Sequence, residues 1–177
     1  MDWFSPTPHG HIRPARHGGR PSVSEIADDL LIGEYPAHGD AQWLKLEHRV
    51  TAVHNLQDER DLSLNGIDLE ALRAEYEKHA IRFVHTPIQD GSEDAVRDRL
   101  DVALTELHRL IGPGERVYLH CNAGMNRAPT IAIAYLRAYR KMSLDEAMAL
   151  VKRRRACGPF MAMLEDYFGP RDYKPES

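Results

Sequence analysis

The chain of 177 residues lacks several features that mark specialised classes of protein. Its two cysteines, Cys121 and Cys157, are too few for a disulfide framework or for a zinc site made of four thiolates. It has no run of about 18 apolar residues that would predict a membrane-spanning helix, and its first residues show no apolar stretch of signal-peptide length. The net charge of −4 gives no general case for binding nucleic acid or an anionic membrane. We therefore expect a cytoplasmic protein without a nucleic-acid partner and without membrane insertion.

The composition is that of a folded domain, with 42% hydrophobic and 28% charged residues. Residues 1–23 are rich in Pro, Gly, His and Arg and predict a flexible N-terminal arm. One domain is expected over residues 24–169, followed by a frayed C-terminal tail over 170–177, and a monomer is expected. The histidines of the arm stand among Gly and Pro and indicate a solvated segment rather than a metal site: His9, His11 and His17.

Apolar runs alternate with amphipathic segments along the rest of the chain. Short apolar or β-branched runs predict strands at 29–33, 50–56, 81–85 and 116–120. Helical spacing of apolar residues predicts helices at 40–48, 68–79, 92–111, from 128 onwards, at 143–155 and at 159–168. This alternation predicts an α/β fold with a central, mostly parallel sheet of about four to five strands flanked by helices.

The pattern C-x5-R joins Cys121 to Arg127. An apolar strand precedes the cysteine and a helix follows the arginine, so the loop between them is expected at the carboxyl end of a sheet strand, where α/β folds place ligands. The backbone N–H groups of such a loop can converge on an anion, helped by the positive end of the following helix. The same field favours a thiolate at the cysteine.

These residue types suit attack on a phosphate ester. A thiolate at Cys121 can attack phosphorus, and the planar guanidinium of Arg127 can hold two of its oxygens. Gly124 lets the backbone pass close to the phosphate. The alternative is a buried structural cysteine beside a surface arginine, which would leave the coincidence of strand, glycine and helix without a purpose.

Several segments resemble a known family. HCNAGMNRAPT is similar to the signature loop of the dual-specificity branch of the protein tyrosine phosphatase superfamily. LLIGEYP, VTAVHNLQDERDL, NGIDLEALR, PIQDGSED, RVYLHCNAGMNRAP and KRRRACGP look like the plant-type glucan phosphatases that dephosphorylate starch, with laforin a more distant relative. The similarity covers about residues 26–166 and implies a phosphocysteine intermediate, no metal and no cofactor. It assigns phosphate binding to the loop residues Asn122, Ala123, Gly124, Met125 and Asn126.

The leaving oxygen needs a proton, and a positioned acid must supply it. The resemblance places this acid in the loop after the strand at 81–85, 31 residues before the cysteine, which identifies Asp90. The neighbouring Gly91 would allow the loop to move. Asp94 is the alternative, although its position suits the first turn of a helix, where the dipole favours an acid.

Other residues near the loop have expected supporting roles. His120 either orients the loop by hydrogen bonding or is a satisfied core histidine. Asn126 stands where the family usually has Gly, and because Asn tolerates a left-handed backbone we predict that the loop still closes. Ala128 lacks the hydroxyl that eases departure of the thiolate, a loss that the glucan phosphatases share. The basic run 152–155 is interpreted as a solvated helix face, and Cys157 as a packing residue, with a resolving thiol as its alternative.

The aromatic residues that glucan phosphatases lay against sugar chains are missing here. Gly91 follows the expected acid, and Leu64 and Asn65 precede the GIDL segment. Loss of these stacking faces should reduce carbohydrate affinity. The aromatics that remain available are Tyr35, Trp43 and Phe160.

The sequence thus predicts a phosphatase that hydrolyses phosphate monoesters through a phosphocysteine, with Cys121, Arg127 and Asp90 as its catalytic residues. The expected partner is a phosphorylated substrate, either a phosphoglucan or a protein carrying phosphorylated Tyr, Ser or Thr, with phosphoinositides as a third class. Two rivals remain: a module that binds phosphorylated ligands without turnover, and a sulfur-transfer enzyme, which would not need Asp90.

Overall fold

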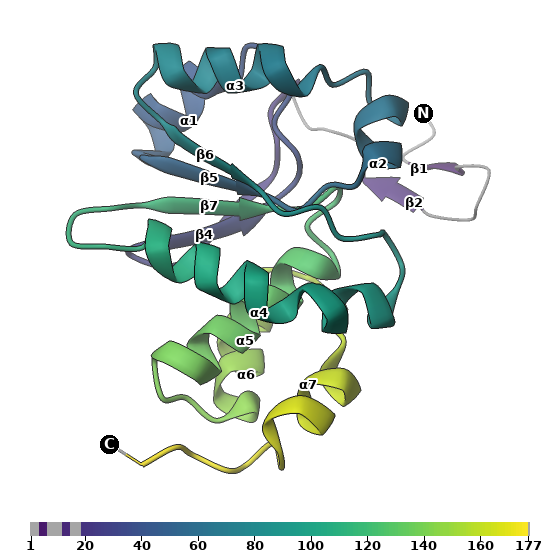
Figure 1. Cartoon of the computed structure of the whole chain (residues 1–177), viewed down its shortest axis with the longest axis vertical. Helices are drawn as coiled ribbons and strands as arrows, with labels where there is room; N and C mark the ends of the chain where they lie inside the picture. Colours follow the sequence, from purple (N-terminus) through teal and green to yellow (C-terminus); the bar gives the residue numbers. More distant parts are fainter. Residues whose placement is uncertain (1–3, 7–11, 15–18, 177) are drawn as a thin grey trace.

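The computed structural model describes residues 4–6, 12–14 and 19–176. Its centre is one sheet whose strands lie in the order β3-β4-β7-β5-β6 (Figure 1). The strands are β3 (Val23–Ala27), β4 (Leu30–Gly33), β5 (Ala52–Asn55), β6 (Arg82–His85) and β7 (Val117–His120). β3 pairs antiparallel with β4, and every other pairing is parallel. The predicted α/β fold with a mostly parallel sheet is therefore confirmed.

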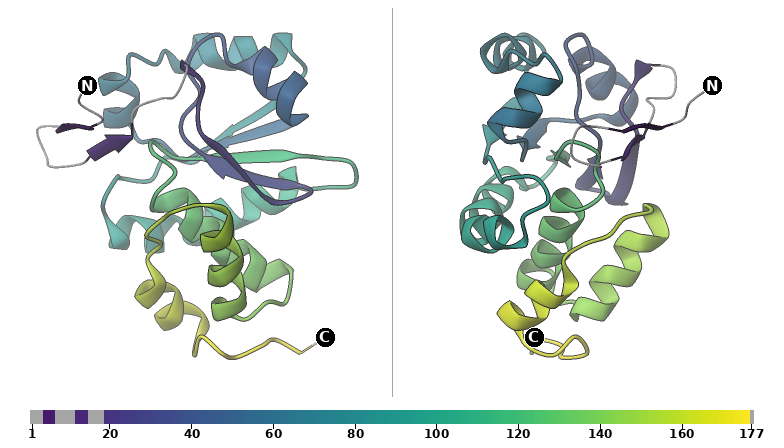
Figure 2. Two further views of the ribbon diagram at one scale, coloured as in Figure 1. Left: turned by 180° about the vertical axis from the view of Figure 1, so that it is seen from behind. Right: turned by 90° about the vertical axis from the view of Figure 1, so that its right-hand side faces the viewer.

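Helices cover both faces of this sheet (Figures 1 and 2). α1 (Ala41–His48) and α3 (Leu69–Lys78) lie on one face, whereas α4 (Glu93–Leu110) and α5 (Arg127–Tyr139) lie on the other. α6 (Leu144–Arg154) and α7 (Met161–Phe168) pack against α5. Because both faces are covered, β4, β5 and β7 are buried at every position, including the polar residues His54, Asn55 and His120.

Alternate strand side chains separate into two cores. On β4, Leu30 and Ile32 join the core beneath α4 and α5, whereas Leu31 joins the core beneath α1 and α3. On β7, Leu119 and Tyr118 divide in the same way. This alternation fixes the register of the sheet, because a slip by one residue would exchange the two faces.

Polar side chains cap the starts of α4 and α6. Ser92 Oγ accepts a hydrogen bond from Ala95 N at 3.1 Å and starts α4, as the sequence predicts. Ser143 and Glu146 form a reciprocal capping box at the start of α6.

Within the domain that follows the N-terminal arm, the sequence did not predict two elements. In β3 only Ile26 is fully buried, so this edge strand carries little apolar signal. α2 (Glu59–Leu64) has six residues, and Asp58 starts it through a capping box with Asp61. Figure 1 places α2 beside the carboxyl ends of the parallel strands, where it becomes part of the site.

The two chain ends differ from the core. Within the predicted arm, β1 (Phe4–Pro6) and β2 (Ile12–Pro14) pair antiparallel, and the rest of the arm up to residue 18 lies outside the described residues. The C-terminal tail, which the sequence predicts to be frayed, instead packs on the helices. Arg171 O accepts from Asp145 N at 3.1 Å, and the guanidinium of Arg137 lies 5.2 Å from the ring of Tyr173.

Candidate active site

β7 delivers Cys121 to the carboxyl edge of the sheet, and the chain then turns through residues 122–126 into α5. Cys121 is buried, with 3% of its surface exposed. The neighbouring strand β5 lies parallel to β7, with Asn55 opposite His120, so the loops after both strands meet at the same edge. Figure 1 shows this edge on the side where α4 and α5 also begin.

The carbonyl groups of the loop all point to partners elsewhere in the protein. Asn122 O accepts from Tyr35 N, and Met125 O accepts from Gly158 N at 2.8 Å. Asn126 O accepts from both the N–H and the hydroxyl of Thr130. Between them, the carbonyls of Ala123 and Gly124 accept from the side chain of one arginine, Arg155.

The N–H groups of the same loop are left without acceptors. Within the described part of the chain, no backbone N–H from Asn122 to Arg127 donates a hydrogen bond. Because the carbonyls are held outward, these donors are available to an anion bound inside the turn, at the positive end of α5. The loop therefore has the arrangement of donors that an oxyanion-binding site requires.

Two glycines let the loop pack tightly against β4. Gly124 has φ of +65°, and a Cβ placed on it would lie 2.6 Å from the carbonyl carbon and oxygen of Gly33. A Cβ on Gly33 would in turn meet Ser22 O at 2.1 Å. Neither position has room for a side chain, and Gly124 also needs the left-handed backbone.

Arg127 is the first residue of α5 and one of the largest fully buried side chains. Its Nη1 donates to Asp61 Oδ2 at 2.7 Å and to Ile88 O at 2.8 Å. Its Nη2 lies 2.9 Å from Asp90 Oδ1, and its Nε is buried with no hydrogen-bond acceptor among the described residues. Nη1 thus anchors the guanidinium, and the fork of Nε and Nη2 is the edge that can hold two oxygens.

The charges around Arg127 keep it ionised. Burial by itself lowers the pKa of Arg127, but the nearby Cys121, Asp61 and Asp90 raise it above its ordinary value. The structure therefore brings the three residues expected to be catalytic into one group.

Asp61 is a site residue that the sequence did not reveal. It is buried on α2, and it holds Arg127 from a position 66 residues earlier in the chain. Burial raises the pKa of Asp61, Arg127 opposes this shift, and Asp58 and Asp90 add repulsion. The one local signal is the spacing of Asp58 and Asp61, which is that of a capping box and does not point to Arg127.

Asp90 lies in the loop between β6 and α4, with about a third of its side chain exposed. Asp58 fixes this loop, because its Oδ2 accepts from Asp90 N at 3.0 Å. Gly91 follows with φ of +68°, a left-handed backbone that suits glycine. The alternative acid, Asp94, lies in the first turn of α4, and the ion pairs of Arg127 among the described residues are with Asp61 and Asp90 instead.

His120 is fully buried, and burial lowers its pKa to about 3, so it is neutral at physiological pH. Its Nδ1 lies 3.0 Å from Cys121 O, a contact in which the carbonyl accepts and Nδ1 donates. Of the two roles expected for His120, this contact favours orienting the first residue of the loop. Ala128, also buried, follows Arg127 in α5.

The structure replaces the left-handed backbone expected at Asn126 and limits the solvated face expected for 152–155 to three of its four residues. Asn126 has φ of −124° and ψ of −70°, so it is not left-handed; its Nδ2 instead donates to Gly158 O at 2.7 Å. The basic run 152–155 is exposed in its first three residues, but Arg155 is 92% buried and holds the loop carbonyls. Cys157 packs against the core as expected, and burial raises its pKa.

The available aromatics are divided between the site and the rest of the protein. Tyr35 lies beside the loop, since its N–H bonds to Asn122 O. Phe160 lies behind the loop, where its N–H bonds to Thr130 Oγ1 at 3.0 Å. Trp43 is on α1 and packs against His48 and Arg20.

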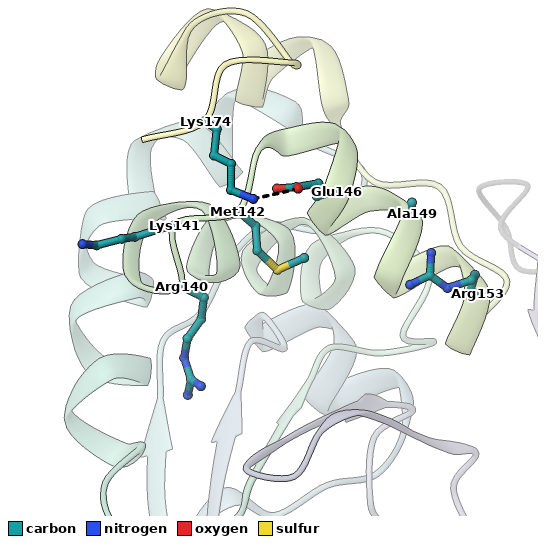
Figure 3. Close-up of a pocket in the computed structure, with 7 residues that line it drawn as sticks. All are labelled: Arg140, Lys141, Met142, Glu146, Ala149, Arg153 and Lys174. Atoms are coloured by element: carbon teal, nitrogen blue, oxygen red, sulfur yellow. Dashed lines mark hydrogen bonds and ion pairs between the residues drawn. The ribbon is translucent and has the colours of Figure 1, made fainter. Parts of the chain in front are cut away.

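A separate hollow lies at the far end of α5 (Figure 3). It has a volume of about 500 Å³, and basic side chains dominate its lining. Because α5 spans 13 residues, or roughly 20 Å, this hollow is remote from Cys121. Its lining residues are Arg140, Lys141, Met142, Glu146, Ala149, Arg153 and Lys174.

The residues that the structure describes lack two further kinds of feature. They contain no cluster of three or more His, Cys, Asp or Glu side chains that could hold a metal ion. None of their helices combines the length and the apolar character needed to cross a membrane.

Comparison with known proteins places this arrangement in context. Residues 30–167 match the family model described as dual specificity phosphatase, catalytic domain. The chain is 33% identical over 154 residues to the amyloplastic phosphoglucan phosphatase DSP4 of Castanea sativa, covering 85% of this chain and 40% of the relative. It is 28% identical over 124 residues to laforin of Mus musculus, covering 64% of this chain and 38% of the relative. The chain thus spans about two fifths of the length of these relatives.

Solved structures show the same fold. The active form of Tk-PTP aligns with a TM-score of 0.68 and 26% identity, covering 82% of this chain and 95% of the other. PTPMT1 in complex with PI(5)P aligns with a TM-score of 0.69 and 21% identity, covering 81% and 90%.

Proposed function

The chain belongs to the family of dual specificity phosphatase catalytic domains, and from this premise we propose that it hydrolyses phosphate monoesters at the loop of residues 121–127. The observation that carries the proposal is the orientation of that loop, with its carbonyls held outward and its N–H groups without acceptors among the described residues. A phosphoryl group spreads negative charge over three oxygens, and such converging donors stabilise it.

The first step forms a phosphocysteine. The thiolate of Cys121 attacks phosphorus, a new S–P bond forms, and the bond from phosphorus to the ester oxygen breaks. Asp90 gives its proton to the departing oxygen, which leaves as an alcohol or phenol. The Nε and Nη2 fork of Arg127 binds two of the phosphoryl oxygens during the transfer.

The second step restores the enzyme. Asp90, now a carboxylate, takes a proton from water, and the resulting oxygen attacks phosphorus as the S–P bond breaks. Inorganic phosphate and the Cys121 thiolate are released. No redox partner and no metal ion takes part in this sequence.

Supporting residues hold this geometry. Asp61 anchors Nη1 of Arg127, and Asp58 fixes the backbone of the acid loop. His120 and Arg155 hold carbonyls of the phosphate-binding loop.

Two substrate classes lead, a phosphoglucan and a phosphorylated protein. The first is supported by the similarity to DSP4, whose name describes a phosphoglucan phosphatase, and the second by the absence of aromatic side chains at Gly91, Leu64 and Asn65. Phosphoinositides are the third class, and the PI(5)P complex of PTPMT1 supports them through the fold alone. A cytoplasmic location and a monomeric state stay predictions from composition.

The chemistry is tested with a small aryl phosphate and the variant Cys121→Ser. We expect the natural chain to release inorganic phosphate, and the acid-quenched enzyme to carry one phosphate on Cys121 by mass spectrometry. Cys121→Ser should lose turnover yet still bind an oxyanion such as tungstate. Binding without turnover in the natural chain would instead identify a phospho-ligand module. The acid is tested on an alkyl phosphate, whose leaving group needs a proton, and unchanged activity of Asp90→Ala on that substrate would favour a sulfur-transfer enzyme.

The substrate class is tested by comparing phosphate release from solubilised amylopectin and from a phosphotyrosine peptide. Turnover of the peptide at least tenfold faster per enzyme would exclude the glucan assignment, and the opposite result would exclude the protein assignment.

A further inference from the structure

Carboxylates gather at the carboxyl edge of the sheet, around the site whose function is proposed above. The segments that follow β5 and β6 in sequence, residues 56–64 and 86–94, carry six acidic residues and one basic residue, Arg60. We call these carboxylates the acidic edge: Asp58, Glu59, Asp61, Asp90, Glu93 and Asp94. Figures 1 and 2 show α2 and the start of α4 on either side of the turn that follows β7, so the two segments flank the phosphate-binding loop.

Two members of the acidic edge share one cation, and a third, Asp58, holds the backbone of both. Arg127 lies 2.7 Å from Asp61 and 2.9 Å from Asp90, and Asp58 bonds to the backbone N–H of both of these aspartates. Their mutual repulsion contributes to the raised pKa of Asp61, after burial and against Arg127. Since Cys121 is to act as a thiolate beside the same guanidinium, Arg127 does not balance the negative charge around it.

The other three members stand outside this cluster and are exposed to solvent. Glu59 opens α2, and Glu93 and Asp94 open α4. No ion pair joins any of them to another described residue. Their helix positions are favoured by the dipole, but their field also acts on a substrate within a Debye length of about 10 Å.

A phosphate ester is itself an anion, so the acidic edge repels it unless the rest of the substrate compensates. A neutral sugar chain cannot compensate, and a phosphoinositide with several phosphates adds to the repulsion. Lysine or arginine side chains beside the phosphorylated residue would meet Glu59, Glu93 and Asp94 favourably. Leu64 and Asn65, where a sugar would need aromatic faces, offer none.

Resting on the proposed phosphatase function, we propose that the substrate is a phosphorylated protein segment with basic residues next to the phosphorylated side chain. The acidic edge is then the specificity determinant of the site. It selects by charge, whereas the loop at Cys121 and Arg127 recognises the phosphate itself.

The test uses three phosphotyrosine peptides of equal length, flanked on both sides by two lysines, two glutamines or two glutamates. We expect kcat/KM to fall in that order, with the lysine peptide at least about tenfold above the glutamate peptide at low ionic strength. Raising the salt from roughly 20 to 200 mM should shrink this ratio, because screening weakens exposed charges.

A triple variant and a matched control locate the effect. Glu59→Gln, Glu93→Gln and Asp94→Asn together should lower the ratio of lysine to glutamate peptide severalfold. Removing the same number of charges elsewhere, by Glu47→Gln, Glu77→Gln and Asp172→Asn, should leave the ratio as it is. These three control residues are exposed; Glu47 and Glu77 lie in the last turns of α1 and α3, before β5 and β6 begin, and Asp172 lies in the C-terminal tail, whereas the acidic segments follow the carboxyl ends of β5 and β6.

The outcomes separate this inference from the function on which it rests. If the natural chain hydrolyses the small aryl phosphate but shows equal kcat/KM for the three peptides, the charge selection is refuted while the phosphatase stands. The charge selection is also refuted, while the phosphatase stands, if the control variant lowers the ratio as much as the triple variant of the acidic edge. Faster dephosphorylation of solubilised amylopectin than of the lysine peptide would have the same meaning. If the aryl phosphate itself is not hydrolysed, the proposed function fails and this inference with it.

Discussion

Arg155 offers the sharpest test of how the phosphate-binding loop is held. Its Nε donates to Gly124 O at 2.7 Å and its Nη2 to Ala123 O at 3.0 Å, while Nη1 reaches the hydroxyls of Ser22 and Ser24. The substitution Arg155→Met keeps a long, unbranched side chain and removes every one of these donors.

The expected cost follows from the two loop contacts. A hydrogen bond to a charged group contributes roughly 1.5–3 kcal/mol, so two of them represent about 3–6 kcal/mol. Water will replace part of this, and we expect the free energy of unfolding of Arg155→Met to fall by about 2–4 kcal/mol. The carbonyls of Ala123 and Gly124 are then free to rotate, which turns the opposite N–H groups away from the bound oxyanion. Loss of one such donor costs about 10²- to 10³-fold in kcat in enzymes of known mechanism.

Two measurements check this reasoning: urea unfolding for stability, and kcat and KM on a small aryl phosphate for function. The matched control is Arg153→Met, because Arg153 belongs to the same basic run but is exposed. We expect it to change stability by less than about 0.5 kcal/mol and to leave kcat unaltered. Natural values of both stability and kcat in Arg155→Met would refute the claim that this side chain holds the loop.

Three further predictions concern the loop, the acid and the core. Gly124→Ala forces a Cβ to within 2.6 Å of the Gly33 backbone and requires φ of +65°, so kcat should fall by at least about 10²-fold; a crystal structure with the loop unmoved would contradict this. Asp90→Asn should lower kcat by about 10²- to 10⁴-fold for an alkyl phosphate, and less for an aryl phosphate whose leaving group needs no proton; equal losses would argue against an acid role. Burial lowers the pKa of His54 to about 3, below its unfolded value near 6.5, so the unfolded state binds the proton more readily in this interval. The contribution of His54 to the free energy of unfolding is therefore fully present above about pH 6.5 and is lost as the pH falls toward 3. At pH 4.5 this loss amounts to about 2–3 kcal/mol. His54→Gln, which can still bond to Thr86, should make the free energy of unfolding fall less steeply between pH 6.5 and pH 3. An unchanged dependence of this free energy on pH would refute the assignment.

The sequence by itself determined the parts of the site that are local in the chain. Cys121 and Arg127 stand in one strand–loop–helix unit of seven residues, so their spacing alone brings them to the same turn. The capping role of Ser92 and the helical spacing of α4 are equally local. The carboxyl edge could also be located, because parallel strands of an α/β sheet end together.

Only the tertiary structure decided which distant side chains complete the loop. Asp61 meets Arg127 because β5 and β7 are neighbours in register, and no local pattern encodes that pairing. Arg155 has the same chemistry as Arg153 and Arg154, and only the packing of α6 against α5 turns one of the three inward. The backbone of Asn126 likewise follows from its bond to Gly158 and not from the intrinsic preference of asparagine. Contacts between segments far apart in the chain depend on how the elements pack, and the chemistry of a single residue does not specify that packing.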